Sequence, residues 1–316
     1  MAPREPGSGR PTERFALIGF GALGHAFAEG LRRGGAAEVR VFARDRPDPD
    51  AARALRERLR AAGVRTCSSI EEAVERAGAV VAAVPAGAAA AVAAACAPSL
   101  PASGVYFDPA PLHPAEKARL AALIGEAGGR YADLAVLGTV AVSGAAVPCL
   151  AAGPGAQRWR ELVAPRGFDV TAIDGPAGRA SLVKLLRSVY MKGRDALILE
   201  MLLAARRHGV DDEVLHSIGG PGEQVPFPDL ARRVVTSLAV YAERRAAELG
   251  AAAELIAEAD LEPLMADAGA ARLRWLAEVA PREHFGGERP ADLDAVLAAV
   301  EALDAARAPR ASGGPS

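Results

Sequence analysis

Residues 14–42 read R-F-A-L-I-G-F-G-A-L-G-H-A-F-A-E-G-L-R-R-G-G-A-A-E-V-R-V-F. The short apolar run at the start predicts a strand over Arg14–Ile18, and the next stretch predicts a helix over His25–Arg33. A second strand is predicted over Glu38–Phe42. A G-x-G-x-x-G motif lies between the first strand and the helix. This order of strand, glycine motif, helix and strand is typical of a dinucleotide-binding unit.

The glycine motif predicts which residues contact a dinucleotide. Gly19 would permit the tight turn, Gly21 would let a pyrophosphate approach the backbone, and Gly24 would let the helix pack closely on the strand. The positive end of the helix would face the phosphates. The alternative is a chance cluster in a chain with 33 glycines. The expected cofactor contacts in this turn are Gly19, Phe20, Gly21, Ala22, Leu23 and Gly24.

The residues after the second strand bear on the choice of cofactor. An acidic side chain about 20 residues beyond the glycines would bind the ribose hydroxyls of NAD. Ala43 stands near that position and is followed by Arg44 and Asp45. A small residue followed by arginine leaves room for a 2′-phosphate and offers it a charged partner. We therefore expect NADP, while Asp45 keeps NAD possible and Arg44 could also be an ordinary loop charge.

Strands and helices alternate up to residue 174, which predicts a mostly parallel, doubly wound sheet. Ligands bind at the carboxyl ends of the strands in such a sheet, which selects Gly19–Gly24, Val84-Pro85 and Leu137–Thr139. The further strands are expected at Val64-Arg65, Ala79–Val84, Val105–Phe107, Tyr131–Val136, Val147–Ala152 and Phe168–Ile173, and the helices at Pro49–Ala62, Ile70–Ala77, Ala88–Ala95 and Ala115–Gly125.

A long helix is predicted from about Gly178–Ser181 to Gly209. About 30 residues at 1.5 Å each give a rod of roughly 45 Å, long enough to join two domains. Lys184, Arg187 and Ser188 share one face near its start, because residues three and four apart are neighbours. Lys184 is one of only three lysines in a chain rich in arginine. It is either a solvated lysine at a helix start or a proton donor, since lysine can lose its proton when partly buried.

The chain beyond Gly209 is predicted to be helical and carries no motif of its own. The expected organisation is a flexible tail at residues 1–13, an α/β nucleotide-binding domain at 14–174, an all-α domain at 175–307 and a second tail at 308–316. The expected helices are Asp211–Ile218, Asp229–Glu248, Ala251–Glu258, Leu261–Val279 and Ala291–Ala306, with an irregular loop at Gly219–Pro228.

Composition excludes several classes of protein. A formal net charge of -2 gives no indication of a nucleic-acid or membrane-surface partner. Three widely spaced cysteines argue against a zinc site or a disulfide framework and fit a reducing cytoplasm. Residues 77–107 carry no charge, but prolines interrupt them, so a buried strand and an alanine-rich helix explain them better than a membrane span. We expect a soluble cytoplasmic protein without a bound metal.

Taken together, these motifs make the chain resemble the β-hydroxyacid dehydrogenase family, which includes 3-hydroxyisobutyrate dehydrogenase and relatives of 6-phosphogluconate dehydrogenase. The helical half looks most like a bacterial subgroup with a poorly characterised phosphogluconate-dehydrogenase-like C-terminal domain. The family pattern G-x-G-x-M-G appears as G-F-G-A-L-G at Gly19–Gly24. Its pattern G-x-x-G-x-G-x-x-x-K-x-x-x-N aligns with residues 175–188, where Ala180 replaces a glycine and Ser188 replaces the asparagine. The loop D-A-P-V-S-G-G aligns with residues 133–139, where Leu137 replaces the serine.

The resemblance implies reversible hydride transfer between a nicotinamide and a small carbonyl or hydroxy substrate. It implies that Lys184 is the proton donor or acceptor, with Ser188 as an aid and Arg187 as a partner for an anionic substrate group. Leu137, Gly138 and Thr139 would line the substrate. The alternatives are an NADP-dependent imine reductase, which usually carries another residue at the position of Lys184, and a nucleotide-binding protein without catalysis.

The apolar run of residues 196–205 predicts a homodimer, because a helix that is apolar all round needs cover on every side. The resemblance implies pairing through the helical domain as well. The alternative is that residues 230–249 and 261–279 wrap the long helix within one chain.

Overall fold

The computed structural model describes residues 14–45, 47–218 and 225–307. The predicted tails, residues 1–13 and 308–316, lie outside the described residues, as does most of the predicted loop Gly219–Pro228. The chain divides into two compact units, Met1–Arg187 and Ser188–Ser316. The domain boundary expected after residue 174 stays a prediction, because the helix that begins near it continues from one unit into the next.

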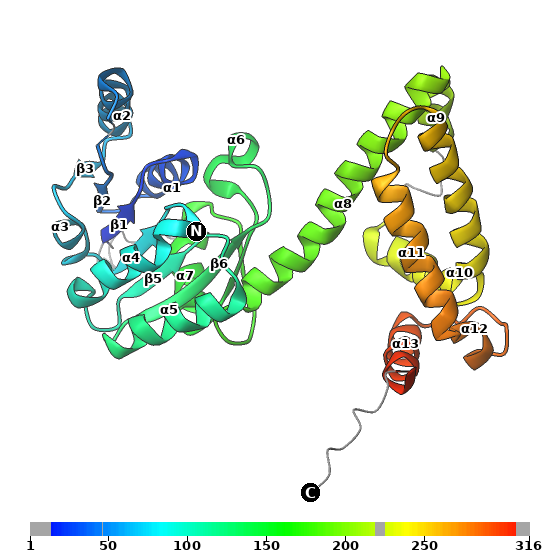
Figure 1. Ribbon diagram of the computed structural model, residues 1–316. Coiled ribbons are helices and arrows are strands. Elements are labelled where there is room, and N and C mark those ends of the chain that lie inside the picture. Colours follow the sequence, from blue (N-terminus) through cyan, green and yellow to red (C-terminus); the bar gives the residue numbers. More distant parts are fainter. Residues whose placement is uncertain (1–13, 46, 219–224, 308–316) are drawn as a thin grey trace, which may run out of the picture. The chain divides into compact units, whose positions relative to one another are not determined.

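The described residues of the first unit form an eight-stranded sheet with the order β3-β2-β1-β4-β5-β6-β7-β8 (Figure 1). Neighbouring strands are parallel except β6 and β7, which are antiparallel. The predicted doubly wound fold is therefore confirmed. The strands are β1 (Arg14–Ile18), β2 (Glu38–Phe42), β3 (Arg65–Thr66), β4 (Ala79–Ala82), β5 (Val105–Asp108), β6 (Arg130–Val136), β7 (Cys149–Ala152) and β8 (Val170–Ala172).

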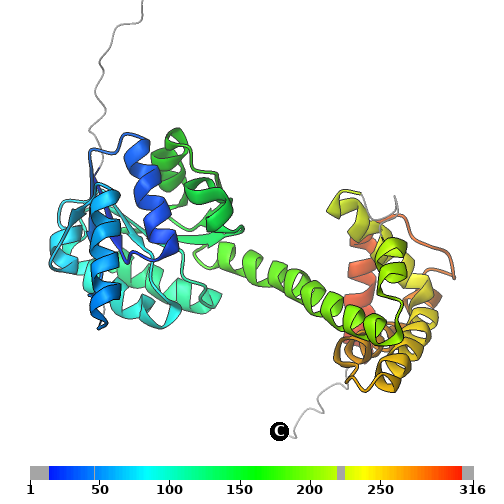
Figure 2. The same ribbon diagram turned by 90° about the horizontal axis from the view of Figure 1, so that it is seen from above.

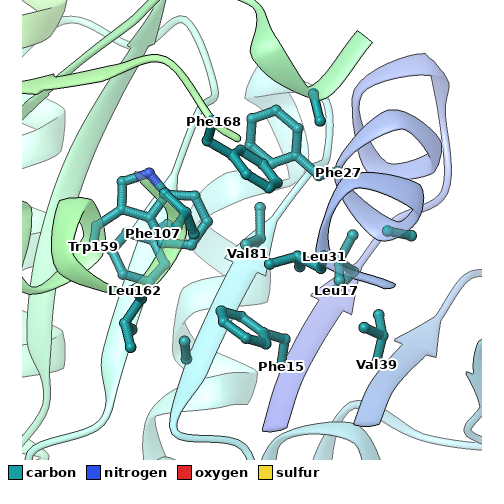
Figure 3. Packing of buried hydrophobic residues seen from close by; sticks show 14 of the residues in the cluster. Phe15, Leu17, Phe27, Leu31, Val39, Val81, Phe107, Trp159, Leu162 and Phe168 are labelled. Atoms are coloured by element: carbon teal, nitrogen blue, oxygen red, sulfur yellow. The ribbon is translucent and has the colours of Figure 1, made fainter. Parts of the chain in front are cut away.

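Successive strand residues point to opposite sides of the sheet. Both sides are apolar here, and helices cover each of them. Phe15 and Leu17 of β1 pack under α1 (Ala22–Arg33), α2 (Pro49–Ala61) and α7 (Ala156–Val163). Ala16 and Ile18 pack on the other face, under α3 (Ile70–Val74), α4 (Ala86–Cys96) and α5 (Pro114–Glu126). The centre of the first face is aromatic, with the rings of Phe107 and Trp159 4.0 Å apart (Figure 3).

Short elements at the strand ends differ from the prediction. Helix α1 begins at Ala22, three residues earlier than expected, because Gly21 already serves as its N-cap. Strand β4 ends at Ala82 and not at Val84, since Pro85 is the N-cap of α4. The short helix α6 (Val140–Ser143) was not predicted, nor were the 3-10 turns Ala97–Ser99, Gly144–Ala146 and Ala164–Arg166.

The remainder of the described chain is helical, as predicted. Helix α8 (Arg179–His208) is one continuous helix of 30 residues that begins in the first unit and ends in the second (Figures 1 and 2). Helices α10 and α11 pack against each other in the second unit (Figure 1). The other helices are α9 (Asp211–Ile218), α10 (Phe227–Glu258), α11 (Leu264–Val279), α12 (Pro281–His284) and α13 (Leu293–Arg307).

The predicted break between Glu248 and Ala251 is wrong. Helix α10 runs through Gly250, and its one non-helical residue is Tyr241, with φ −113° and ψ 15°. A glycine inside a helix costs only about 1 kcal/mol. Residues on either side of Gly250 pack against α8 and α11, as in the cluster of Ala204, Ala253, Ile256 and Ala266, and this burial outweighs that cost. No helix within the described ranges combines the length and the apolar character that a membrane crossing requires.

Candidate active site

The glycine motif forms a tight turn between β1 and α1. Gly19 has φ +97°, and a Cβ built there would lie 2.3 Å from the carbonyl oxygen of Ala83. A Cβ on Gly24 would lie 2.4 Å from the carbonyl oxygen of Gly19. Only glycine fits at these two positions, because any side chain would meet backbone that cannot move aside. The turn is therefore pressed against Ala83 and Val84, which directly follow β4.

The N-terminus of α1 has the features that a pyrophosphate group requires. Gly21 is its N-cap without a side-chain cap, and the first turn carries no acidic residue. A Cβ built on Gly21 would meet no atom within 4 Å, so the backbone is open to a close approach. Backbone N–H groups and the positive end of a helix bind phosphate well. The residues in this turn thus fit the dinucleotide that the motif implies.

The side chains around the turn divide into buried and exposed ones. Phe20 is only 3% exposed and belongs to the core beneath α1, while the Arg58 guanidinium lies 5.6 Å from its ring centroid. The turn therefore offers a ligand the backbone of Phe20 rather than its ring. Arg44 and Asp45 follow β2 and are both exposed. Asp45 pairs with Arg56 of α2 at 3.6 Å. Val84 is half-buried, and Pro85 is exposed.

Lys184 lies in the second turn of α8 and is half-buried. Burial lowers the pKa of its ammonium group below the ordinary lysine value, and the positive charge of Lys117 lowers this pKa further. The charge of Asp133 acts in the opposite direction, as a thiolate at Cys149 would. Burial raises the pKa of the Cys149 thiol to about 12, so this neighbour is neutral at physiological pH. The environment of Lys184 thus favours the release of its proton.

The predicted substrate residues lie near the start of the same helix. Leu137 packs against a small cluster of Ala135, Ala152 and Ala180, and Ala180 lies in the first turn of α8. Gly138 is held beside Val147 and Pro148, and Thr139 is the exposed N-cap of α6. The structure therefore brings the segment 137–139 to the beginning of α8.

Ser188 lies one helical turn after Lys184 and is half-buried, while Arg187 is exposed. Both follow Lys184 along α8, at the boundary where the first compact unit ends. Their roles toward a substrate stay predictions.

Sequence reasoning missed a group of buried charges next to Lys184. Lys117 of α5, Asp108 of β5 and Asp133 of β6 are each 0% exposed. The Lys117 ammonium lies 3.1 Å from Asp108 Oδ2 and 3.3 Å from Asp133 Oδ1. Two signals could have revealed it. Lys117 is one of three lysines, and the two aspartates belong to successive predicted strands, Asp108 directly after one and Asp133 inside the apolar run of the next.

Two family models match parts of the chain. Residues 14–108 match the family described as NADP oxidoreductase, coenzyme F420-dependent. Residues 205–276 match a domain of unknown function, DUF1932. The first match covers the glycine turn and β1 to β5, and the second covers the end of α8 through most of α11.

Individual relatives are distant. An uncharacterised 28.5 kDa protein of Methanothermus fervidus is 26% identical over 162 residues, 51% of this chain and 62% of that protein, so the match spans less than two thirds of the relative. The solved structure of MTH1747, a conserved protein of unknown function described as similar to 3-hydroxyacid dehydrogenases, is 28% identical with a TM-score of 0.57. That alignment covers 84% of this chain and 98% of the other.

Two enzymes share the fold at lower identity. A reductive aminase from Aspergillus terreus, solved with NADPH and ethyl levulinate, is 20% identical with a TM-score of 0.64 and covers 91% of this chain and 99% of its own. An imine reductase variant from Myxococcus stipitatus, solved with NAD+, is 16% identical with a TM-score of 0.69 and the same coverage. The two family models and the similarity to MTH1747 support the resemblance to the β-hydroxyacid dehydrogenase family of NAD(P)-dependent oxidoreductases, with a DUF1932-type C-terminal domain, while the two enzymes show a shared fold.

Proposed function

We propose that the protein is an NADP-dependent oxidoreductase that transfers a hydride between nicotinamide and a small carbonyl or hydroxy substrate, with Lys184 as proton donor and acceptor. The observation that carries this proposal is the environment of Lys184. Its half-buried ammonium has a lowered pKa, and the first turn of its helix belongs, through Ala180, to the cluster against which Leu137 packs at the end of β6. A surface lysine at a helix start would have neither property.

The chemistry needs a proton at the substrate oxygen. Reduction of a carbonyl builds negative charge on its oxygen, and an ammonium group within about 3 Å would stabilise that charge and donate the proton. A lowered pKa suits this role, because a proton donor works best when its pKa is near the operating pH. The bound nicotinamide supplies or accepts the hydride. Ser188, four residues on, would orient the same oxygen, and Arg187 would bind an anionic substrate group.

The preference for NADP rests on Arg44 and on the partner of Asp45. Arg44 is exposed at the end of β2, where it can reach a 2′-phosphate. Asp45 pairs with Arg56, so its charge is partly neutralised, which weakens the argument for its binding ribose hydroxyls in NAD. The structural relative solved with NAD+ keeps NAD as the alternative cofactor.

An imine substrate is the second candidate function. The observation that favours it is the similarity to an imine reductase and a reductive aminase. Lys184 favours the oxygen substrate, because an ammonium group can donate to the developing oxyanion. Leu137 and Ser188, which depart from the family pattern, leave a third possibility of nucleotide binding without catalysis.

We also propose a homodimer built on the helical unit. Leu197, Ile198 and Leu199 of α8 are 45%, 43% and 61% exposed. Phe227 at the start of α10 packs on Tyr190 of α8 with the ring centroids 4.7 Å apart, and near the end of α8 Ala204 packs with Ala253, Ile256 and Ala266. A second copy of the chain would cover Leu197, Ile198 and Leu199. These residues belong to the run 196–205, which is apolar on more than one face and needs cover on each.

The test is a reaction panel with matched lysine variants. The protein is mixed with NADPH or NADH and with aldehydes, keto acids and cyclic imines, and cofactor oxidation is followed. With the substrate that reacts, Lys184→Met should reduce turnover by about 100-fold or more, the usual size of an acid–base contribution, and leave NADPH affinity nearly unchanged. Lys192→Met is the control, because Lys192 is an exposed lysine two turns further along α8. Near-normal turnover of Lys184→Met would remove lysine from the mechanism, and turnover of imines alone would establish the second candidate.

A further inference from the structure

Three charged groups are enclosed between β5, β6 and α5, and we call Asp108, Lys117 and Asp133 the buried charge cluster. Asp108 and Asp133 are paired residues in the register of the parallel strands β5 and β6. Their side chains therefore point to the same face of the sheet as neighbours, where two carboxylates would repel each other. The ammonium of Lys117 lies between them and also donates to the Asp108 carbonyl oxygen at 2.7 Å.

The two carboxylates are fully occupied by hydrogen bonds. Asp108 accepts from the Tyr131 hydroxyl at 2.6 Å and from the Ala110 backbone N–H at 2.9 Å. Asp133 accepts from the backbone N–H groups of Gly178 and Ser181 at 3.1 and 2.8 Å, and from the Ser181 hydroxyl at 2.6 Å. Such complete pairing is what buried charges require.

Stability alone does not account for this cluster. Replacing a buried group of paired charges by well-packed apolar residues is often neutral or stabilising. Lys117 also lies in the first turn of α5, and cations are favoured near the opposite end of a helix. A residue that conflicts with its local structure in this way is typical of a functional site.

The cluster holds the first turn of the helix that carries Lys184. Asp133 binds the N–H groups of Gly178 and Ser181, which is the role of a helix cap. Gly178 has φ +99°, and a Cβ there would lie 2.6 Å from the carbonyl oxygen of Pro114. The start of α8 is thereby pressed onto the start of α5. Lys184 follows Ser181 by three residues, about one helical turn.

The cluster also supplies the charges that act on Lys184. The charge of Lys117 lowers the pKa of Lys184, and that of Asp133 raises it. Cys149 of β7, whose thiolate would also raise the pKa of Lys184, is a neutral thiol at physiological pH because of its own raised pKa.

We propose that Lys117 is a positioning residue for Lys184, which it serves by holding Asp133 as the cap of α8 and by placing a second positive charge beside the Lys184 ammonium. An effect of Lys117 on catalysis rests on the proposed function, in which Lys184 transfers the proton. The positions of the Lys117 and Asp133 charges do not depend on that function.

The test uses the three lysines as reporters in the full chain without cofactor or substrate. Protein labelled with ¹³C and ¹⁵N at lysine gives one side-chain signal each for Lys117, Lys184 and Lys192, and the variants Lys184→Met and Lys192→Met assign two of them. The pH titration of the Lys184 signal is then followed in the wild type and in Lys117→Met. Removal of the positive neighbour should move the Lys184 midpoint to higher pH and leave that of Lys192 unchanged.

A second variant covers the case in which Lys117→Met does not fold. Asp108→Asn combined with Lys117→Met removes one charge of each sign. The asparagine oxygen remains an acceptor for the Tyr131 hydroxyl, and Asp133 remains in place as the cap of α8. The Lys184 midpoint should again rise. An unchanged or lower midpoint in the variant that folds would overturn the inference. A higher midpoint in a protein that reduces no substrate would support the inference and count against Lys184 as a proton donor.

Discussion

The two compact units bury their apolar side chains to very different extents. The largest side chains that are fully buried, Trp159, Tyr106 and Tyr131 among them, all belong to the first unit. The second unit buries mainly alanines, as in the cluster of Ala204, Ala253 and Ala266 with Ile256. Large apolar residues such as Leu199, Leu264 and Leu297 stay 47–61% exposed there.

The physical reason lies in the architecture of the two units. A sheet with helices on both faces encloses two layers of side chains, one on each side. Helices that pack through alanines approach closely and leave their larger side chains at the margin of the contact. Exposed apolar patches of this kind on a chain usually mark an interaction surface. The first unit therefore completes its own core, and we expect the second to complete its core with another chain.

The largest effect is expected in the core of the first unit. Phe107 is 0% exposed and packs against Trp159, so Phe107→Ala should lower the free energy of unfolding by about 3–5 kcal/mol. Leu264→Ala in the second unit is the matched control, and it should cost roughly 1 kcal/mol or less, because Leu264 is 61% exposed. Urea denaturation followed by circular dichroism measures both. Equal losses in the two variants would contradict the comparison.

The next effect concerns association of the helical unit. Sedimentation equilibrium at micromolar concentration should show a dimer of the 32.4 kDa chain. Leu199→Asp should weaken this dimer by about 3 kcal/mol, roughly 150-fold, since a buried leucine is lost and a carboxylate is placed in an apolar interface. Val142→Asp, at an apolar residue of the first unit that is 84% exposed, should leave it unchanged. A wild-type species at the chain mass alone would rule the dimer out.

A smaller effect is expected at the exposed end of β2. Arg44→Ala should reduce NADPH binding by about 1.5–3 kcal/mol, roughly 10- to 150-fold, because one charged partner of the 2′-phosphate is lost. NADH binding should change little. Fluorescence titration of both cofactors measures the difference. If both cofactors lose affinity equally, or neither does, Asp45 becomes the better candidate for recognition of the ribose.

The smallest effect is expected in the pH dependence of stability, and it distinguishes two lysines of α8, Lys184 and Lys192, that lie in different units. The pKa of Lys184 is lowered in the folded protein, so between this pKa and the ordinary lysine value the unfolded chain binds more protons than the folded one. Stability should therefore rise with pH across this window and lose that gain as pH falls through the folded-state pKa. Unfolding measured over alkaline pH should show a flatter profile in Lys184→Met. Lys192→Met should follow the wild type, and an identical profile in Lys184→Met would contradict the expected linkage.

Much of the fold could be predicted because its signals are local. Strands β1 and β2 and helix α9 begin and end at the predicted residues, since each is a short periodic run bounded by clear breakers. The long helix α8 begins within the predicted range Gly178–Ser181 and ends at His208, directly before the predicted stop at Gly209. The predicted break near Gly250 failed because packing of Ala253 and Ile256 in the second unit outweighs the helix propensity of one glycine.

The sequence by itself determined the glycine turn, the alternation of strands and helices, the long helix and Lys184 as the candidate proton donor, because each depends on residues close together in the chain. Only the tertiary structure decided that Asp108, Lys117 and Asp133 meet. Their meeting depends on the pairing register of β5 and β6 and on the packing of α5, which no local pattern encodes. The exposure of Leu199 was decided in the same way, because burial of a periodic apolar face depends on which other helices reach it.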